Sequence, residues 1–334
     1  MKETQAKSVH APGHKISKAT TLRIGLKVLG VLLSALYITN LFAHFWIKDR
    51  IAEFALIYYA TPLPMLVLAG FVIAAFHFFT KQHQLARLAV VLALICLISW
   101  PLQSFSLNWT THSNDQLKLF FWNIAQKKRT DEVIKLIERE KADIIGIVES
   151  GIKRRHRKIW EETFPEYHVE FLRKQMLLLT KGKIIDREEG SISRRGFYHL
   201  FKISLDGKLF TVLLIDIKAD PPTSRAVVFE QLEKIILPHR QERLIVMGDF
   251  NTPLQSVHFE RLRKHLDHAF EAGGNGFAET WPSPFPLLTI DHIWVSPFIE
   301  VQDCTLKQSS FSDHRAISAT VNITENPDLA TNPD

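Results

Sequence analysis

The chain has 334 residues, of which 41 are basic and 35 acidic, so its formal net charge is only +6. This balance tolerates anionic partners without requiring them. Cys96 and Cys304 are far apart and no C-x-x-C pair occurs, so neither a disulfide framework nor a thiolate zinc site is indicated. The length allows one large domain with additions, or two domains.

The first third of the chain is strongly apolar. Residues 1–23 form a basic tail, and apolar segments follow at about 24–47, 54–79 and 85–102. A helix needs about 20 apolar residues to cross a bilayer. We therefore expect three transmembrane helices within 24–102, the second kinked at its prolines. Three such segments in succession favour membrane spans over buried core helices and over a cleaved signal peptide.

Basic residues predict how this region is oriented. The tail carries five, and the link between the second and third segments carries Lys81 and Arg87, whereas those in the first link are partly balanced by acidic neighbours. By the positive-inside rule the tail stays in the cytoplasm. Residues 103–116 then form a tether and 324–334 a flexible tail. We expect a multi-pass protein of a bacterial cytoplasmic membrane, with residues 117–323 on the periplasmic or extracellular side.

Residues 117–323 alternate apolar strands with amphipathic helices. Strands are predicted at about 117–122, 142–148, 167–172, 176–180, 198–203, 210–215, 244–246, 289–295 and 316–321, and helices at 131–139 and 224–236. Several of the strands end in a carboxylate or an amide. A basic run at 153–158 fits a phosphate-facing patch or a solvated helix face.

The stretch LIVMGDFNTP, residues 244–253, carries the first chemical signal. Asp249 and Asn251 are two residues apart at the end of a buried strand, so their side chains point the same way. A carboxylate there can take a proton, and an amide can orient a phosphate or a water. Alone, these ten residues also fit a strand that ends in an Asx turn.

Five motifs follow one another along the chain: FWNIA, IVES, GDFNTP, TIDHIWV and SDHRAI. In this order they resemble the endonuclease/exonuclease/phosphatase superfamily over residues 117–321. The resemblance implies an α/β fold, a four-layer sandwich of two packed β-sheets flanked by helices. It also implies a phosphoester hydrolase that acts by metal-assisted attack of water on phosphorus. The partners would be the membrane and a phosphoester, either nucleic acid or a phospholipid headgroup; no protein partner is inferred.

The resemblance implies a metal site. Glu149 matches the principal Mg²⁺ ligand, with Asn123 beside it in contact with metal or phosphate, and Asp313 matches an auxiliary ligand. Oxygen ligands without thiolates suit Mg²⁺ or Mn²⁺ rather than zinc.

The resemblance also implies the catalytic roles. Asp249 matches the residue that positions and activates the attacking water, and Asn251 the amide that orients the phosphate or that water. His314 matches the histidine that faces the scissile phosphate, and Asp291 the acid that fixes its tautomer. A His–Asp pair is a common means of holding a protonated imidazole. His292 follows Asp291 directly, so we expect it on the opposite strand face in a structural role.

One position departs from the family pattern. Most members have a histidine at the end of the strand that precedes the helix before GDFN, and this chain has Asp216 there. An aspartate repels phosphate unless a cation intervenes. Lys218 or Arg225 could supply the missing positive charge, and Asp216 could join a second cation site. The sequence thus leaves open a nuclease, a lipid phosphodiesterase of sphingomyelinase type, and a non-catalytic module that binds a phosphorylated ligand.

Overall fold

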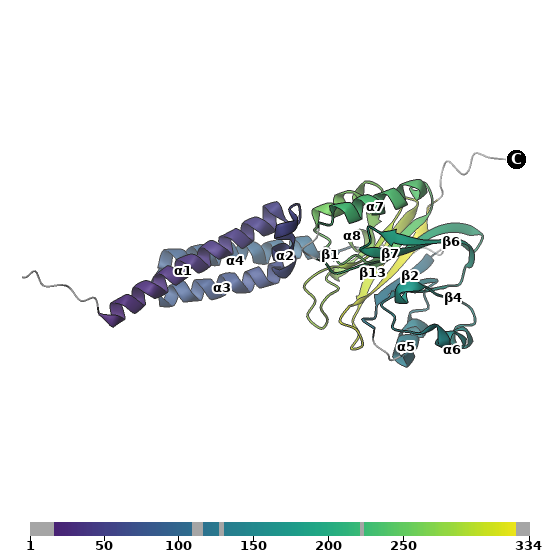
Figure 1. Cartoon of the computed structure of the whole chain (residues 1–334), viewed down its shortest axis with the longest axis horizontal. Coiled ribbons are helices and arrows are strands. Elements are labelled where there is room, and N and C mark those ends of the chain that lie inside the picture. Colours follow the sequence, from purple (N-terminus) through teal and green to yellow (C-terminus); the bar gives the residue numbers. More distant parts are fainter. Residues whose placement is uncertain (1–16, 109–115, 127–129, 221–223, 325–334) are drawn as a thin grey trace, which may run out of the picture.

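The computed structural model describes residues 17–108, 116–126, 130–220 and 224–324. A helical bundle extends from one side of an α/β unit (Figure 1). The bundle contains α1 (Lys18–Phe42), its continuation η1 (Ala43–Ile47), α2 (Ala52–Ala60), α3 (Leu63–Phe79) and α4 (His83–Ser104). Helices α1, α3 and α4 lie side by side, and α2 lies at the end of the bundle next to the α/β unit (Figure 1).

Two stretches of the bundle, Lys18–Ile47 and His83–Ser104, are long and apolar enough to cross a membrane. The pair α2 and α3 meets the same criteria only together, and it is bent by 73° at the break between them. Pro62 precedes α3 and Pro64 lies in its first turn, so the predicted kink is confirmed. The expected third span is not confirmed, because α3 alone has 17 residues.

The α/β unit contains two six-stranded sheets. The first has the order β13-β14-β2-β3-β5-β4 and the second β10-β12-β9-β8-β7-β6. The first comprises β2 (Gln116–Asn123), β3 (Ile144–Val148), β4 (His168–Phe171), β5 (Leu177–Thr180), β13 (Ile299–Lys307) and β14 (Ala316–Ile323). The second comprises β6 (Lys183–Ile192), β7 (Gly196–Leu205), β8 (Lys208–Ile217), β9 (Leu244–Asp249), β10 (Asp267–His268) and β12 (Asp291–Val295). Each sheet contains one parallel pair, β2 with β3 and β8 with β9.

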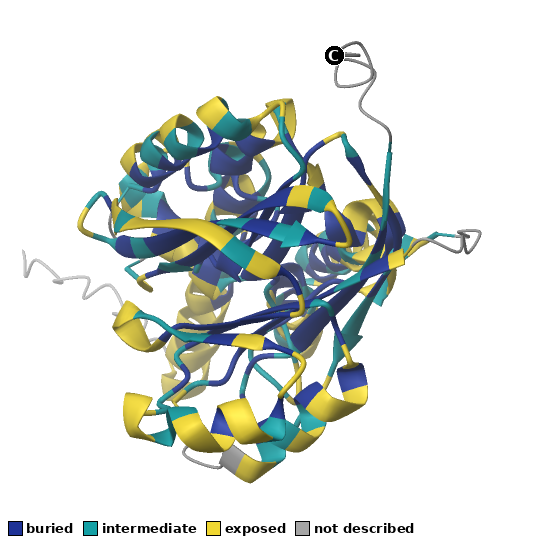
Figure 2. Cartoon of the chain, turned by 90° about the vertical axis from the view of Figure 1, so that its right-hand side faces the viewer, coloured by how far each residue is buried: buried dark blue, intermediate teal, exposed yellow. Residues whose placement is uncertain are grey.

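The two sheets pack face to face and helices cover their outer faces. Apolar side chains such as Phe121 and Leu178 of the first sheet share one core with Val212, Met247 and Ile293 of the second. Helices α5 (Thr130–Glu140) and α6 (Arg157–Thr163) pack on the first sheet, and α7 (Ala226–Ile236) packs on the second. Figure 2 shows the buried strands between two helical layers whose outward faces are exposed. The predicted four-layer sandwich is therefore confirmed.

The bundle is joined to the sandwich by further backbone pairing. Strand β1 (Phe105–Leu107) pairs antiparallel with β11 (Asn275–Phe277), which follows the short helix α8 (Ala269–Gly273). The predicted tether, 103–116, thus includes the end of α4, strand β1 and the first residue of β2. Residues 109–115 lie outside the described residues, as do 1–16 of the basic tail and 325–334 of the C-terminal tail. The predicted domain boundaries stay a prediction. Single 3₁₀ turns occur at Arg154–His156, Arg173–Gln175, Leu237–His239, Val257–Glu260 and Leu262–Lys264.

Candidate active site

Polar side chains from both sheets gather at one end of the sandwich. In the second sheet, Asp216 of β8 is in register with Asp249 of β9, and Asp249 is in register with Asp291 of β12. Neighbouring strands lie about 4.8 Å apart, so these three carboxylates form a row. In the first sheet, Asn123 ends β2 and Glu149 follows β3. The structure thus brings together five of the residues that the sequence singled out.

Asn123 joins the two sheets beneath the site. Its side-chain nitrogen donates to Asp249 Oδ2 at 2.8 Å and to Glu149 Oε1 at 3.2 Å. Its oxygen accepts from the backbone N–H of Ala125 at 2.9 Å. Asn123 is fully buried, so all the hydrogen-bonding capacity of its amide nitrogen serves to hold two carboxylates in place.

Asp249 is held by the loop that follows it. Its Oδ1 accepts from the backbone N–H of Asn251 at 2.8 Å, and its Oδ2 accepts from the Asn251 side chain at 3.0 Å. The Asn251 amide also donates to the carbonyl of Ile217 at 2.8 Å. Gly248 is required just before this turn, because a Cβ there would lie 2.3 Å from the Ile215 carbonyl oxygen.

Two residues of the site have a left-handed backbone. Glu149 has φ +48° and Asn251 has φ +47°. Asparagine tolerates this conformation, whereas a glutamate in it is uncommon and strained. Strain of this kind persists where the surroundings fix it, and it concentrates at functional sites. The strained backbone of Glu149 is thus an independent indication that its carboxylate has a functional role.

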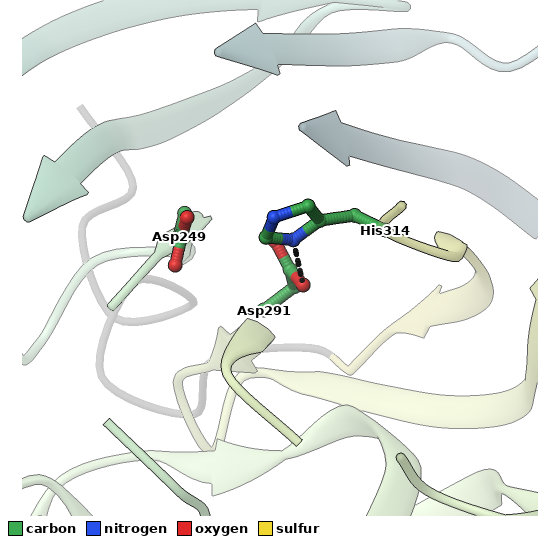
Figure 3. A group of neighbouring side chains, drawn as sticks. All are labelled: Asp249, Asp291 and His314. Carbon is green, nitrogen blue, oxygen red and sulfur yellow. Dashed lines mark hydrogen bonds and ion pairs between the residues drawn. The ribbon is translucent and has the colours of Figure 1, made fainter. Parts of the chain in front are cut away.

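His314 and Asp291 form a buried ion pair. His314 Nδ1 lies 2.8 Å from Asp291 Oδ2. The other ring nitrogen is directed toward the side on which Asp249 lies (Figure 3). The backbone of this loop is fixed to the first sheet, because Ser312 Oγ donates to the Asn123 carbonyl and Trp122 Nε1 donates to the His314 carbonyl.

The charges in the site are strongly coupled. Burial alone would lower the pKa of His314, but the Asp291, Asp249 and Asp313 carboxylates outweigh it and raise the pKa to about 9. His314 is therefore a cation at neutral pH. Burial, then repulsion by Glu149 and Asp291, raises the pKa of Asp216 to about 6. Burial and the Asp291 charge also raise the pKa of Asp249 well above its usual range.

These groups open into one pocket of about 850 Å³. Its polar lining residues include Glu149, Asp216, Asp249, Asn251, Asp313, His314, Lys174 and Lys218. Four carboxylates thus share one pocket with few cations to balance them. Burial and, after it, repulsion between carboxylates raise the Asp216 and Asp249 pKa values, and a bound cation would relieve the repulsion.

The oxygen atoms present fit a hard divalent cation. Side-chain atoms of Asp249, Asp291 and His314 lie within 4.8 Å of one another, but a protonated imidazole cannot be a ligand. Glu149 and Asp313 line the same pocket and offer further carboxylate oxygens. Trp281 holds Asp313 Oδ2 at 3.1 Å, while the buried Asp313 Oδ1 has no hydrogen-bond partner among the described residues. Ligands of this kind match Mg²⁺ or Mn²⁺.

Other predicted residues lie apart from the cluster. Lys218 is exposed and lines the pocket, whereas Arg225 is buried behind the loop, where it donates to the carbonyls of Lys218 and Asn251. His292 packs on the opposite face of β12, as expected, where Nδ1 contacts His268 at 3.1 Å and Nε2 contacts the Thr252 carbonyl.

Sequence reasoning missed several residues that shape the site. Thr280 Oγ1 accepts the backbone N–H groups of Ile290 and Asp291, which sets the start of β12. Trp281 holds Asp313, and both Thr280 and Trp281 lie in the loop FAETWPSPFP. A polar residue and a tryptophan in a proline-rich loop are the only signals that the sequence offers for these roles.

The fold and the site together define a class, the α/β-sandwich proteins that gather carboxylates, amides and a His–Asp pair at the strand ends. Within that class the chain belongs to the endonuclease/exonuclease/phosphatase family, whose model matches residues 120–314. Members of this family are hydrolases that act on phosphoesters. No curated protein sequence is significantly similar to the chain.

Solved structures with the same fold share little sequence with this chain. The endonuclease/exonuclease/phosphatase from Bacteroides vulgatus is 18% identical over 63% of this chain and 100% of its own, with a TM-score of 0.52. Truncated Caenorhabditis elegans TDP2 is 19% identical over 62% and 97%, with a TM-score of 0.52. D. rerio TDP2 complexed with single strand DNA product is 11% identical over 63% and 100%, with a TM-score of 0.50. At these identities the likeness concerns the fold alone.

Proposed function

We propose that the protein is a divalent-cation-dependent phosphoester hydrolase of phosphodiesterase or nuclease type, anchored in a membrane. The observation that carries the proposal is the convergence of Asp249, Asp291 and His314, whose side-chain atoms lie within 4.8 Å of one another beside Glu149. A base, a cation and metal ligands that share one pocket are the parts that water attack on phosphorus needs.

Asp249 prepares the attacking water. Asn123 and Asn251 fix its carboxylate through three N–H donors. As the water oxygen bonds to phosphorus, its proton passes to Asp249 and the P–O bond of the ester breaks. The fixed carboxylate orients the water for attack without reorganising during the reaction.

His314 acts on the developing negative charge. Asp291 holds Nδ1 and keeps the ring protonated, which leaves the Nε2–H free to donate to a phosphoryl or leaving oxygen. Mg²⁺ or Mn²⁺, when bound by Glu149 and Asp313, supplies further neutralisation of the phosphoryl charge. Asp216 replaces the histidine of most family members, so in this site cations would neutralise more of the phosphoryl charge.

We also propose that α1, α3 and α4 cross a bacterial cytoplasmic membrane, and that these three crossings place the α/β unit on the periplasmic or extracellular side, opposite the basic tail. The length and apolar character of α1 and α4, and of α3 taken together with α2, support the crossings. The basic residues Lys81 and Arg87 at the far end of the bundle support the orientation. Reporter fusions after Thr324 test this orientation. Alkaline phosphatase, which is active only outside the cytoplasm, should be active at this position, and a reporter that is active only in the cytoplasm should be inactive.

The function is tested with the purified full chain in detergent. We expect Mg²⁺ or Mn²⁺ to support hydrolysis of bis(p-nitrophenyl) phosphate, a phosphomonoester or an oligonucleotide, and we expect EDTA to stop it. His314→Gln should abolish turnover, while His265→Gln should retain it, because His265 pairs with Glu233 away from the pocket. Equal activity in both variants would refute the proposal.

One observation favours a second candidate. Asp216 places an additional negative group where phosphate must approach, which suits a module that binds a phosphorylated ligand without hydrolysing it. Calorimetry separates the two candidates, because heat of binding without turnover across the same substrates would support the non-catalytic module.

A further inference from the structure

The active-site pocket has one wall that comes from the bundle. Leu56, Tyr59 and Ala60 of α2 line the same pocket as Glu149 and His314. Pro253, Leu288 and Ile290 of the α/β unit continue the apolar lining on this side. The pocket therefore has a polar end, where the carboxylates gather, and an apolar end formed in part by a helix of the bundle.

Helix α2 is fixed to the α/β unit by buried polar contacts. Asp49, just before α2, is 1% exposed, and its carboxylate accepts hydrogen bonds from Tyr59, Ser256 and the backbone of Val257. The Asp49 carbonyl oxygen lies 3.1 Å from His258 Nε2. Breaking a buried network of this kind leaves polar groups without partners, so these contacts hold α2 against the α/β unit.

The same contacts lead to the catalytic loop. The Tyr59 hydroxyl interacts with the Arg225 guanidinium, and Arg225 donates to the carbonyl oxygen of Asn251 at 2.9 Å. Asn251 in turn holds Asp249. Helix α2 of the bundle thus contacts Arg225, which holds the loop of Asn251 next to the proposed base Asp249.

The position of α2 corresponds to the edge of a bilayer. Helix α4 has 22 residues and is about 33 Å long, which matches a hydrocarbon core of about 30 Å. It ends at Ser104, next to the α/β unit, and α2 lies at the same end of the bundle (Figure 1). Large apolar side chains at this end are exposed, with Trp46 63%, Ile51 47% and Leu56 51% exposed.

We propose that the substrate is an amphiphilic phosphoester that enters from the bilayer, with its phosphate at His314 and its hydrocarbon chain against α2. This inference rests on the proposed function and specifies its substrate class. A nucleic acid would require a cationic track for successive phosphates, whereas the described residues on the α2 side of the pocket are apolar or uncharged.

The inference is tested with a series of p-nitrophenyl alkyl phosphate diesters, from ethyl to octyl, and the full chain in lipid nanodiscs. Each buried methylene should raise kcat/KM by up to about fourfold, so the octyl ester should exceed the ethyl ester at least about tenfold. Leu56→Ser should remove most of this gain, and so should Ala60→Trp, which fills the same end of the pocket.

Ile57→Ser is the matched control, because Ile57 is a neighbouring exposed residue of α2 that does not line the pocket. It should keep the full gain, which separates contact with α2 from simple partition of the octyl ester into lipid. Hydrolysis without a chain-length gain, an equal gain in Leu56→Ser, or faster cleavage of single-stranded DNA would overturn the substrate class alone. Failure to hydrolyse every ester and oligonucleotide would overturn the proposed function as well.

Discussion

Buried histidines in opposite charge states contact the two faces of strand β12, His314 from a neighbouring loop and His292 from the strand itself. On one face, Asp291 contacts His314, and the surrounding carboxylates raise the pKa of His314 to about 9. On the other face, His292 contacts His268 and a carbonyl, and burial lowers the pKa of His292 to about 4. Both rings are nearly inaccessible, so the partner rather than the degree of burial decides the charge. The protonated His314 on one face can donate to a phosphate, whereas the neutral His292 on the other face packs in the core.

The largest effect should come from Asp249→Asn, which removes the base from the charged face but keeps its shape. We expect kcat to fall about 10³-fold. Burial and Asp291 raise the pKa of Asp249, so loss of the charge should offset the loss of one oxygen that accepts N–H donors, and the thermal unfolding midpoint should change little. A variant that unfolds at a lower temperature would mean that Asp249 serves stability, contrary to our account.

Asp291→Asn should remove the carboxylate that contributes most to the raised pKa of His314. Without the carboxylate the pKa of His314 falls, and the ring loses the proton that it offers to phosphate. We expect kcat to fall about 10²-fold. Steady-state kinetics at pH 7.5 measure the loss, and an unchanged kcat would show that the ion pair is only structural.

The neutral face should make the protein sensitive to acid. The folded-state pKa of His292, about 4, lies below its ordinary 6.5, so its contribution to stability is complete above pH 6.5. That contribution is lost as the pH falls toward 4, by up to about 1.4 kcal/mol per pH unit. Unfolding midpoints measured from pH 7.5 to 4.5 test this, and His292→Gln should have a shallower slope than the wild type.

The smallest effect should come from Asp216→Asn. The folded-state pKa of Asp216, about 6, lies above its ordinary 3.8, so the ionised carboxylate destabilises the fold at pH 8. The full pKa shift corresponds to about 3 kcal/mol. Solvent in the open pocket screens part of this repulsion, so the variant should be about 1 kcal/mol more stable in EDTA. Adding Mg²⁺ should narrow this difference, because a cation offsets the repulsion in the wild type; a difference that Mg²⁺ does not change would place Asp216 outside any cation site.

The sequence predicted most of the central strands and the order of the site residues, because buried strands are continuous apolar runs that end in single polar residues. It missed β6, β10 and β13 of the two sheets and the short pair β1 and β11. The first three are edge strands, and β6 (KIIDREEGSI) is largely exposed and charged, a composition that protects an edge but hides a strand. The convergence of Asn123 with Asp249 depends on how two sheets pack, which no local pattern records.

The bundle shows the same limit. Apolar length predicted helices in this region, but only the structure places Tyr59 against Arg225 and Leu56 in the catalytic pocket. Residues that meet across about 170 positions leave no periodic signal. The 73° bend between α2 and α3, predicted from two prolines, is what directs α2 toward the α/β unit.

The central claim is that the charged face of the sandwich binds a divalent cation through Glu149. Isothermal titration of the full chain with Mn²⁺ at pH 7.5 tests it most directly, with Glu149→Gln as the comparison. Our account predicts saturable binding to the wild type and at least tenfold weaker binding to the variant. Absence of binding to the wild type, or equal affinity in both proteins, would contradict it.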